Sequence, residues 1–175
     1  KILYHNVKSE NWKVSLIFTG ENTLTGGRIL RIKDYIDNEQ FLLTYGDGVG
    51  DINLLKLINS HNLMKKLCTV TAVTPPGRFG LLEVESNGIV SSFNEKPKHK
   101  SSQINGGFFV CEPSIIDLIE NDDVSFEFST LENLAKRNQL NSYKHDGFWK
   151  PMDTLRDKNE LVNLWNSGKA PWKIW

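Results

Sequence analysis

Apolar residues in the first half of the chain cluster into short runs. The runs at residues 14–18, 41–45 and 67–74 have the length of strands, and the last is rich in β-branched residues. Because the run at 41–45 is almost entirely apolar, we expect that strand to be covered on both faces.

Between these runs the apolar positions recur at helical spacing. One helix is predicted to begin at Thr25, and a second to follow Asn53, which can cap it, and to extend to about His61. The buried stripe expected for the first helix consists of Ile29, Leu30, Ile32 and Ile36. A strand–helix–strand rhythm of this kind predicts a mostly parallel sheet flanked by helices.

The second half departs from that rhythm at residues 75–77, Pro-Pro-Gly. Residues 81–85 and 88–94 predict a β-hairpin, because the Asn-Gly pair between them favours a tight turn. The run at 108–111 predicts a further strand, and Pro113 suits the first turn of a helix.

The last third predicts two longer helices. One covers about 126–138, and two short strands are expected on either side of Gly147. Thr154 and Asp157 form a capping-box pattern at the start of the final helix, which Gly168 ends. The expected apolar side of that helix consists of Leu155, Leu161, Val162, Leu164 and Trp165.

Composition narrows the class of protein. The chain has 175 residues, enough for one domain with a core, and 21 acidic against 21 basic residues. Such a balance offers no net attraction to nucleic acid or to an acidic membrane surface. No apolar run approaches the roughly 18 residues of a membrane span, and we expect no signal peptide. Cys68 and Cys111 lie in apolar runs, which favours buried reduced thiols over a disulfide, and the chain is expected to be cytoplasmic.

Two aspartates and a lysine are the strongest candidates for chemistry. Asp47 lies in the turn sequence of residues 44–48, directly after an apolar strand, and Asp153 precedes the last helix. Lys96 is held in a defined direction by the proline that follows it. Two carboxylates and an ammonium suit a divalent metal and a phosphorylated substrate. An ordinary turn, a helix cap and a solvated basic loop are the alternative explanations.

Glycines mark two further candidate segments. Gly26 and Gly27, at a predicted helix start, could present backbone N–H groups to an anion or to a base edge, although Thr25 can also be only an N-cap. Asn105 and Gly107 open a predicted strand, where the asparagine amide could bind sugar hydroxyls. A β-bulge is the alternative there.

The order of these motifs carries more weight than any one of them. In sequence they are Thr-Gly-Gly-Arg at 25–28, Tyr-Gly-Asp-Gly at 45–48, Pro-Pro-Gly-Arg-Phe-Gly at 75–80, Glu-Lys-Pro at 95–97, Ile-Asn-Gly-Gly-Phe-Phe at 104–109 and Gly-Phe-Trp-Lys-Pro-Met-Asp-Thr-Leu-Arg-Asp at 147–157. This series resembles the sugar-1-phosphate nucleotidyltransferases, from about Trp12 to the end of the chain. The resemblance implies an α/β fold of three layers, with a mixed, mostly parallel Rossmann-like sheet and a small β-hairpin region for the sugar.

The resemblance also implies a reaction and its residues. It is greatest to members that join CTP and α-D-glucose 1-phosphate to give CDP-glucose and pyrophosphate, in a pathway to dideoxysugars of bacterial surface polysaccharide. Such enzymes form homo-oligomers and use Mg²⁺. Carried over by motif, Asp47 and Asp153 would hold Mg²⁺, Lys96 would bind the sugar phosphate, Gly80, Glu95, Asn105 and Gly107 would line the sugar pocket, and Gly26, Gly27 and Arg28 would face the nucleotide.

One part of the family pattern does not occur in this sequence. The glycine-rich Gly-Gly-x-Gly-Thr-Arg loop and the later Lys-Pro-Lys-Pro segment, which grip the triphosphate, have no counterpart here. We therefore expect residues 1–175 to form the C-terminal two-thirds of a single domain without its first βαβ portion, and to be inactive alone. A metal-dependent nucleotide-sugar glycosyltransferase and a non-catalytic sugar-phosphate-binding or assembly module remain as alternatives.

Overall fold

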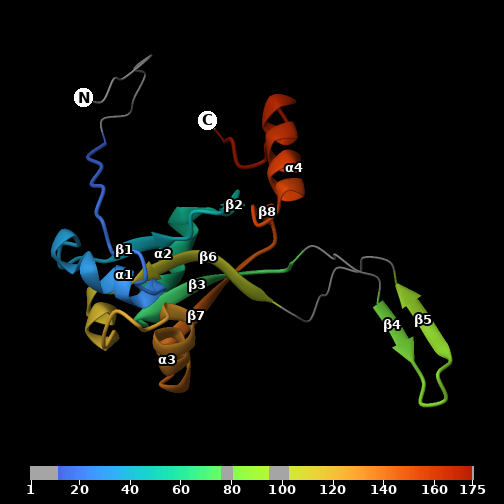
Figure 1. Cartoon of the computed structure of the whole chain (residues 1–175), viewed down its shortest axis with the longest axis horizontal. Coiled ribbons are helices and arrows are strands. Elements are labelled where there is room, and N and C mark those ends of the chain that lie inside the picture. Colours follow the sequence, from blue (N-terminus) through green and yellow to red (C-terminus); the bar gives the residue numbers. More distant parts are fainter. Residues whose placement is uncertain (1–11, 76–80, 95–102, 175) are drawn as a thin grey trace.

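The computed structural model describes residues 12–75, 81–94 and 103–174 (Figure 1). Its strands are β1 (Phe41–Thr44), β2 (Gly48–Gly50), β3 (Cys68–Val73), β4 (Leu81–Val84), β5 (Val90–Asn94), β6 (Ile104–Cys111), β7 (Leu140–His145) and β8 (Trp149–Pro151). Its α-helices are α1 (Thr25–Arg31), α2 (Leu54–Met64), α3 (Glu132–Lys136) and α4 (Leu155–Asn166). Two 3₁₀ segments, η1 (Lys33–Tyr35) and η2 (Pro113–Leu118), and a π-helix, η3 (Phe126–Leu131), complete the described elements.

Four strands form the central sheet in the order β1-β6-β3-β7. β6 is antiparallel to both β1 and β3, whereas β3 and β7 are parallel. Three strands therefore share one direction, and β6 runs against them in the middle of the sheet. The expectation of a mixed α/β sheet is confirmed, but the expectation that it is mostly parallel is wrong in this part of the chain, because β6 makes two of the three strand pairings antiparallel.

The core has two parts because the side chains of β6 alternate between the faces of the sheet. Phe109, fully buried, belongs to a cluster that includes Ile29 of α1 and Phe126 of η3. Val110, the next residue, packs on the opposite face against Leu57 of α2. Helical segments thus cover both faces of the sheet, and this arrangement confirms the expected three layers.

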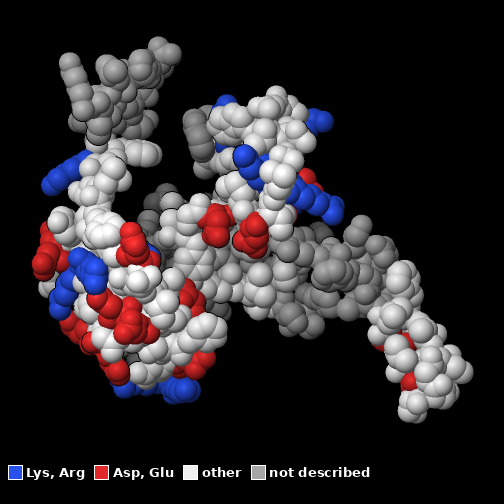
Figure 2. Space-filling model, viewed as in Figure 1, with Lys and Arg blue, Asp and Glu red and all other residues white. Residues whose placement is uncertain are grey.

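Several local predictions are confirmed. Asn53 caps α2 by accepting the N–H of Lys56, and β4 and β5 pair as the expected hairpin, which projects from the rest of the chain (Figure 1). Cys68 and Cys111 face each other across β3 and β6 as buried free thiols, with their sulfur atoms 3.7 Å apart. On the face shown in Figure 2, acidic and basic side chains are intermixed around α1, as the equal charge counts suggest.

The predicted strand at 14–18 is wrong. Val14, Leu16 and Phe18 are 71%, 92% and 82% exposed, and this segment has no strand pairing to any residue that the structure describes. An alternating apolar pattern specifies only which way side chains point; a strand also needs a neighbour for its backbone groups.

The expectation that the strand at 41–45 is covered on both faces is also wrong. Phe41 and Leu43 of β1 pack against the cluster around Phe109, but Leu42 on the opposite face is 48% exposed. The reason is the position of α2, which lies against β3, β6 and β7 rather than over β1.

The final helix starts as predicted but buries less than predicted. The Thr154 hydroxyl accepts the N–H of Asp157 at 3.1 Å, which is the N-cap bond of a capping box, and it also donates to the Asp157 carboxylate at 2.7 Å. Of the five residues on its expected apolar side, only Leu161 is buried, and Leu155 is 71% exposed. In Figure 1, α4 stands away from the four-stranded sheet, so little of its surface meets the core.

Two glycines let α1 approach the connection that precedes η3. A β-carbon on Gly26 would lie 2.6 Å from the Val124 carbonyl oxygen, and one on Gly27 would lie 2.5 Å from the backbone of Asp122. Gly26 also donates its N–H to Val124 at 2.9 Å. The glycines of the Thr-Gly-Gly-Arg motif therefore have a packing role, and their role toward a nucleotide stays a prediction.

We expect Gly27→Ala to destabilise the chain. Helix propensity alone would favour alanine by about 1 kcal/mol, but overpacking against backbone atoms that cannot move aside costs about 1–3 kcal/mol. Urea unfolding of the variant measures the net sign. Gly46→Ala is the matched control, because a β-carbon there would have nothing within 4 Å. A Gly27→Ala chain as stable as wild type would contradict this account of α1 packing.

Candidate active site

A two-stranded ladder brings the two aspartate motifs together. β2 pairs antiparallel with β8, so that Gly48 lies opposite Pro151, and the N–H of Met152 donates to the Asp47 carbonyl at 2.8 Å. Asp153 is the next residue. Two carboxylates 106 positions apart in sequence thus come from adjacent backbone positions at one end of the ladder, and both residues are exposed.

The donor set at this ladder end fits a hard divalent cation. Carboxylate oxygens are ligands that Mg²⁺ prefers, and it commonly completes its shell with water and substrate phosphate rather than with a full protein cage. The described residues contain no group of three or more His, Cys, Asp or Glu side chains placed to hold a metal by themselves. Mg²⁺ would be held by Asp47 and Asp153, and this assignment remains a proposal.

The segment that carries Asp153 is fixed by its aromatic residues. The Trp149 indole N–H donates to the Gly106 carbonyl at 2.8 Å, and the Phe148 ring packs against Trp172 with centroids 5.3 Å apart. Lys150 pairs with Glu160 and, at 3.5 Å, with Asp157 of α4. These contacts hold the loop that carries Asp153 in place.

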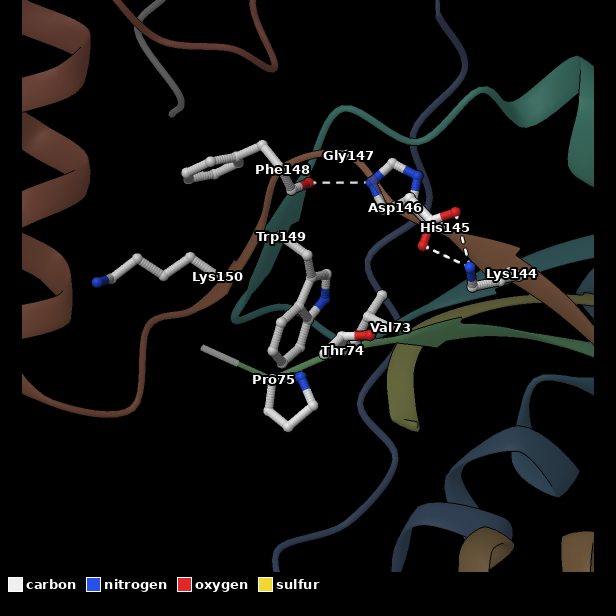
Figure 3. A pocket seen from close by; sticks show the side chains of 10 residues that line it. All are labelled: Val73, Thr74, Pro75, Lys144, His145, Asp146, Gly147, Phe148, Trp149 and Lys150. Carbon is white, nitrogen blue, oxygen red and sulfur yellow. Dashed lines mark hydrogen bonds and ion pairs between the residues drawn. The ribbon is translucent and has the colours of Figure 1, made fainter. Parts of the chain in front are cut away.

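His145 anchors the same segment from the end of β7. Its Nε2 atom lies 3.1 Å from the Phe148 carbonyl oxygen (Figure 3) and 3.0 Å from Oδ1 of Asp51. The hydrogen bond of this atom goes to the Phe148 carbonyl, and Asp51 Oδ1 is a charged neighbour without a hydrogen-bond partner among the described residues. Figure 3 also shows the side chain of Lys150 pointing away from His145, beside a cavity of about 650 Å³.

The segment Asn105–Gly107 lies at the start of β6 and forms the bulge that was the alternative explanation. The pairing of β6 with β3 shifts register between Val70 and Ala72. Gly107 has φ +76°, and its N–H donates to the Asn105 side-chain oxygen at 2.8 Å. A bulge does not exclude a ligand, so the sugar-binding role of Asn105 and Gly107 stays a prediction.

Three of the predicted site residues, Gly80, Glu95 and Lys96, lie outside the described residues. Arg28, which is described, donates to Thr19 and to the carbonyls of Gly20 and Glu21. These bonds join α1 to the segment before it. They leave the predicted contact of Arg28 with the nucleotide untested.

The structure adds Tyr45 and Glu127 to the candidate site, and neither residue was identified there from the sequence. A hollow of about 500 Å³ is lined by Thr25, Tyr45, Gly46, Asp47 and Glu127. Within it, the Tyr45 hydroxyl donates to the Glu127 carboxylate at 2.5 Å. Burial, followed by the bond to Glu127 and the charge of that residue, raises the pKa of Tyr45 well above its ordinary value. Burial opposes the ionisation of Glu127, but hydrogen bonds from Tyr45, Thr25 and Ser125 outweigh it and hold the pKa of Glu127 below its ordinary value. No local motif around Glu127 could have shown this, because the contact spans 82 positions.

Comparison with known proteins decides the family. A model of the nucleotidyl transferase family matches residues 4–157. The chain belongs to this family. The match includes the Tyr-Gly-Asp-Gly turn and runs through Asp153 to the first turn of α4.

Two relatives agree with that assignment, and a solved structure shares the fold. The glucose-1-phosphate cytidylyltransferase of Salmonella typhi is 51% identical over 172 residues, which are 98% of this chain and 66% of the relative. A probable glucose-1-phosphate cytidylyltransferase of Bacillus subtilis is 45% identical, over 95% of this chain and 65% of its own length. The crystal structure of HddC from Yersinia pseudotuberculosis shares the fold, with a TM-score of 0.66 at 23% identity over 89% of this chain and 68% of that one.

These numbers also define the extent of the match. The chain spans about two-thirds of the length of the curated relatives. In the part of the nucleotidyl transferase chain that the structure describes, none of the helices has both the length and the apolar character that crossing a membrane requires.

We expect Mn²⁺, as a paramagnetic probe of the Mg²⁺ site, to broaden the backbone amide signals of Gly48 and Met152. With Asp47→Asn or Asp153→Asn, the Mn²⁺ concentration needed for the same broadening should rise by about tenfold or more. A loss of metal affinity of this size is typical even for residues that contact a metal's ligands rather than the metal itself. Asp37→Asn is the control, since this exposed aspartate precedes β1 at the end of that strand remote from Asp47. Broadening that both site variants leave unchanged would contradict the shared site.

Proposed function

We propose that this chain supplies the metal and sugar-phosphate side of an enzyme that transfers a cytidylyl group from CTP to α-D-glucose 1-phosphate, giving CDP-glucose and pyrophosphate. The observation that carries the proposal is the β2–β8 ladder, which joins Asp47 to the segment of Asp153. The names of two relatives, 51% and 45% identical, support the choice of substrates.

The proposed reaction is an in-line displacement. A phosphate oxygen of glucose 1-phosphate forms a bond to the α-phosphorus of CTP while the bond from that phosphorus to the bridging oxygen of pyrophosphate breaks. Bound Mg²⁺ would supply charge neutralisation for the phosphate oxygens. The chain's own part is to position the reactants, because most of the rate of such transfers comes from positioning and electrostatics.

Each predicted residue has a proposed place in this scheme. Lys96 would pair with the phosphate of glucose 1-phosphate, and Gly80, Glu95, Asn105 and Gly107 would line the sugar pocket. Gly26, Gly27 and Arg28 would face the nucleotide. A cytoplasmic location, assembly as a homo-oligomer and a role in making dideoxysugars for surface polysaccharide belong to the same proposal, as does the assignment of residues 1–175 to the C-terminal two-thirds of one domain.

The family's triphosphate-binding loop suggests the experiment that tests the proposal. We expect no CDP-glucose from the 175-residue chain with CTP, glucose 1-phosphate and Mg²⁺, and we expect synthesis when a Gly-Gly-x-Gly-Thr-Arg segment precedes it in a longer protein. Backbone N–H groups of that segment would stabilise the departing pyrophosphate. Asp47→Asn in the longer protein is the inactive control.

Three outcomes would overturn parts of this proposal. Robust turnover by the 175 residues alone would contradict the placement of the triphosphate site. Inactivity of the longer protein with every nucleotide, despite binding of glucose 1-phosphate, would instead favour the binding or assembly module. Transfer of a sugar from a nucleotide sugar, without release of pyrophosphate from CTP, would favour the glycosyltransferase alternative.

Lys96 gives a second test, on the sugar side. In the longer protein, Lys96→Ala should raise the KM for glucose 1-phosphate by about 10- to 150-fold, the equivalent of a charge-assisted hydrogen bond of about 1.5–3 kcal/mol, with a much smaller effect on the KM for CTP. Lys98→Ala, in the same basic stretch, is the matched control. Equal changes for both substrates would show that Lys96 does not act on the sugar side.

A further inference from the structure

One carboxylate in the hollow accepts hydrogen bonds from three hydroxyl groups. Tyr45 donates to Oε1 of Glu127 at 2.5 Å, while Thr25 and Ser125 donate to Oε2 at 2.7 and 2.8 Å. Thr25 begins α1, Tyr45 follows β1, and Glu127 belongs to η3. Segments 82 and 102 positions away are thus joined to a single side chain.

The network continues beyond the carboxylate in both directions. On one side, Tyr45 accepts the side-chain N–H of Asn105 at 3.1 Å, and Asn105 in turn accepts the N–H of Gly107 at 2.8 Å. On the other side, the Thr25 hydroxyl accepts the N–H of Phe126 at 2.9 Å. The chain of bonds therefore runs from the proposed sugar residues to the start of the Thr-Gly-Gly-Arg motif.

The backbone at Glu127 is held in place by its own helix and by the packing of the preceding residue. It lies on a π-helix, a rare element that is frequent at functional sites, directly after the buried Phe126. Phe126 packs edge-on against Phe109 of β6 with centroids 5.8 Å apart, and Tyr45 packs edge-on against the same ring at 5.6 Å. Tyr45 therefore packs directly on β6, and Glu127 is held against β6 through the neighbouring Phe126.

The charge of Glu127 matters for this arrangement. Three hydroxyl protons point at two oxygens, and only an ionised carboxylate has the acceptor sites for all of them and no proton of its own to place. A glutamine side chain has the same shape but only one acceptor oxygen, and its NH₂ group would point toward hydroxyl donors. Glu127→Gln is therefore a nearly isosteric change that breaks the network without removing packing volume.

We propose that Glu127 is a positioning residue that couples the Asn105–Gly107 segment to the start of α1, and so sets the sugar side and the nucleotide side of the site relative to each other. This inference rests on the proposed function for its substrates. The coupling itself concerns only residues of this chain.

The first experiment measures amide hydrogen exchange by NMR in the 175-residue chain. In Glu127→Gln, the amides of both Gly107 and Phe126 should exchange about tenfold faster, the effect of losing about 1.4 kcal/mol of protection. Tyr45→Phe should speed exchange at Gly107 only, and Thr25→Val at Phe126 only. Glu120→Gln, an exposed glutamate in the connection before η3, is the control and should change neither.

A purely local role for Glu127 gives a different pattern. If Glu127→Gln speeds exchange at Phe126, on its own helix, but leaves Gly107 at the wild-type rate, the coupling is refuted. The coupling is also refuted if Tyr45→Phe leaves the amide exchange rate of Gly107 unchanged.

The second experiment uses kinetics of the longer protein. Tyr45→Phe should raise the KM for glucose 1-phosphate and Thr25→Val the KM for CTP, whereas Glu127→Gln should raise both; Thr25→Ser, which keeps the hydroxyl, should restore the KM for CTP. Unchanged KM values in all variants of an active protein would overturn the positioning role. An inactive wild-type protein would instead refute the proposed function, while the exchange pattern would still decide whether Glu127 couples the two segments.

Discussion

The pairing of β6 with both β1 and β3 is the constraint on which the rest of the molecule depends. Consecutive residues of β6 supply the centres of the two core clusters, Phe109 on one face and Val110 on the other. The same strand begins with the bulge that carries Asn105 and presents the Gly106 carbonyl to Trp149. A strand with both edges paired and both faces covered cannot shift register without exposing apolar surface, so it fixes the elements that carry the candidate site.

Local features of the fold could be predicted from the sequence because their causes are local. A capping side chain, an Asn-Gly turn or an apolar run acts over three or four residues, and Asn53 and Thr154 cap as expected. Expectations failed where the outcome depends on a distant partner. The segment 14–18 has the pattern of a strand without the pairing, and Leu155 of α4 faces away from the core because of where the helix is placed. Glu127 could not be found for the same reason, since its partners are brought to it only by the tertiary fold.

The candidate site also shows why a motif can be predicted without its role being settled. Gly26 and Gly27 resemble residues that approach a nucleotide, yet each is needed to let α1 meet the backbone at Asp122 and Val124. Asn105 resembles a sugar ligand, yet its amide already joins a bulge to a tyrosine. Packing and binding are compatible demands here, because an element that presents backbone or amide groups to a substrate must first be held in place by contacts behind it.

The two acidic residues that line the hollow, Glu127 and Asp47, differ in what surrounds their oxygens, and this difference suggests a division of labour. Glu127 is half-buried and its carboxylate accepts three hydroxyl hydrogens, which uses its lone pairs inside the protein and keeps it ionised. Asp47 lines the same hollow but is exposed, and Asp153 follows the residue bonded to its carbonyl. A cation would therefore meet exposed carboxylates at the end of the β2–β8 ladder, while the fixed charge of Glu127 adds negative potential nearby without competing for the ion. On this argument the metal and the positioning network are separate devices, joined through the short segment from Tyr45 to Asp47 and through the bond from Trp149 to the Gly106 carbonyl.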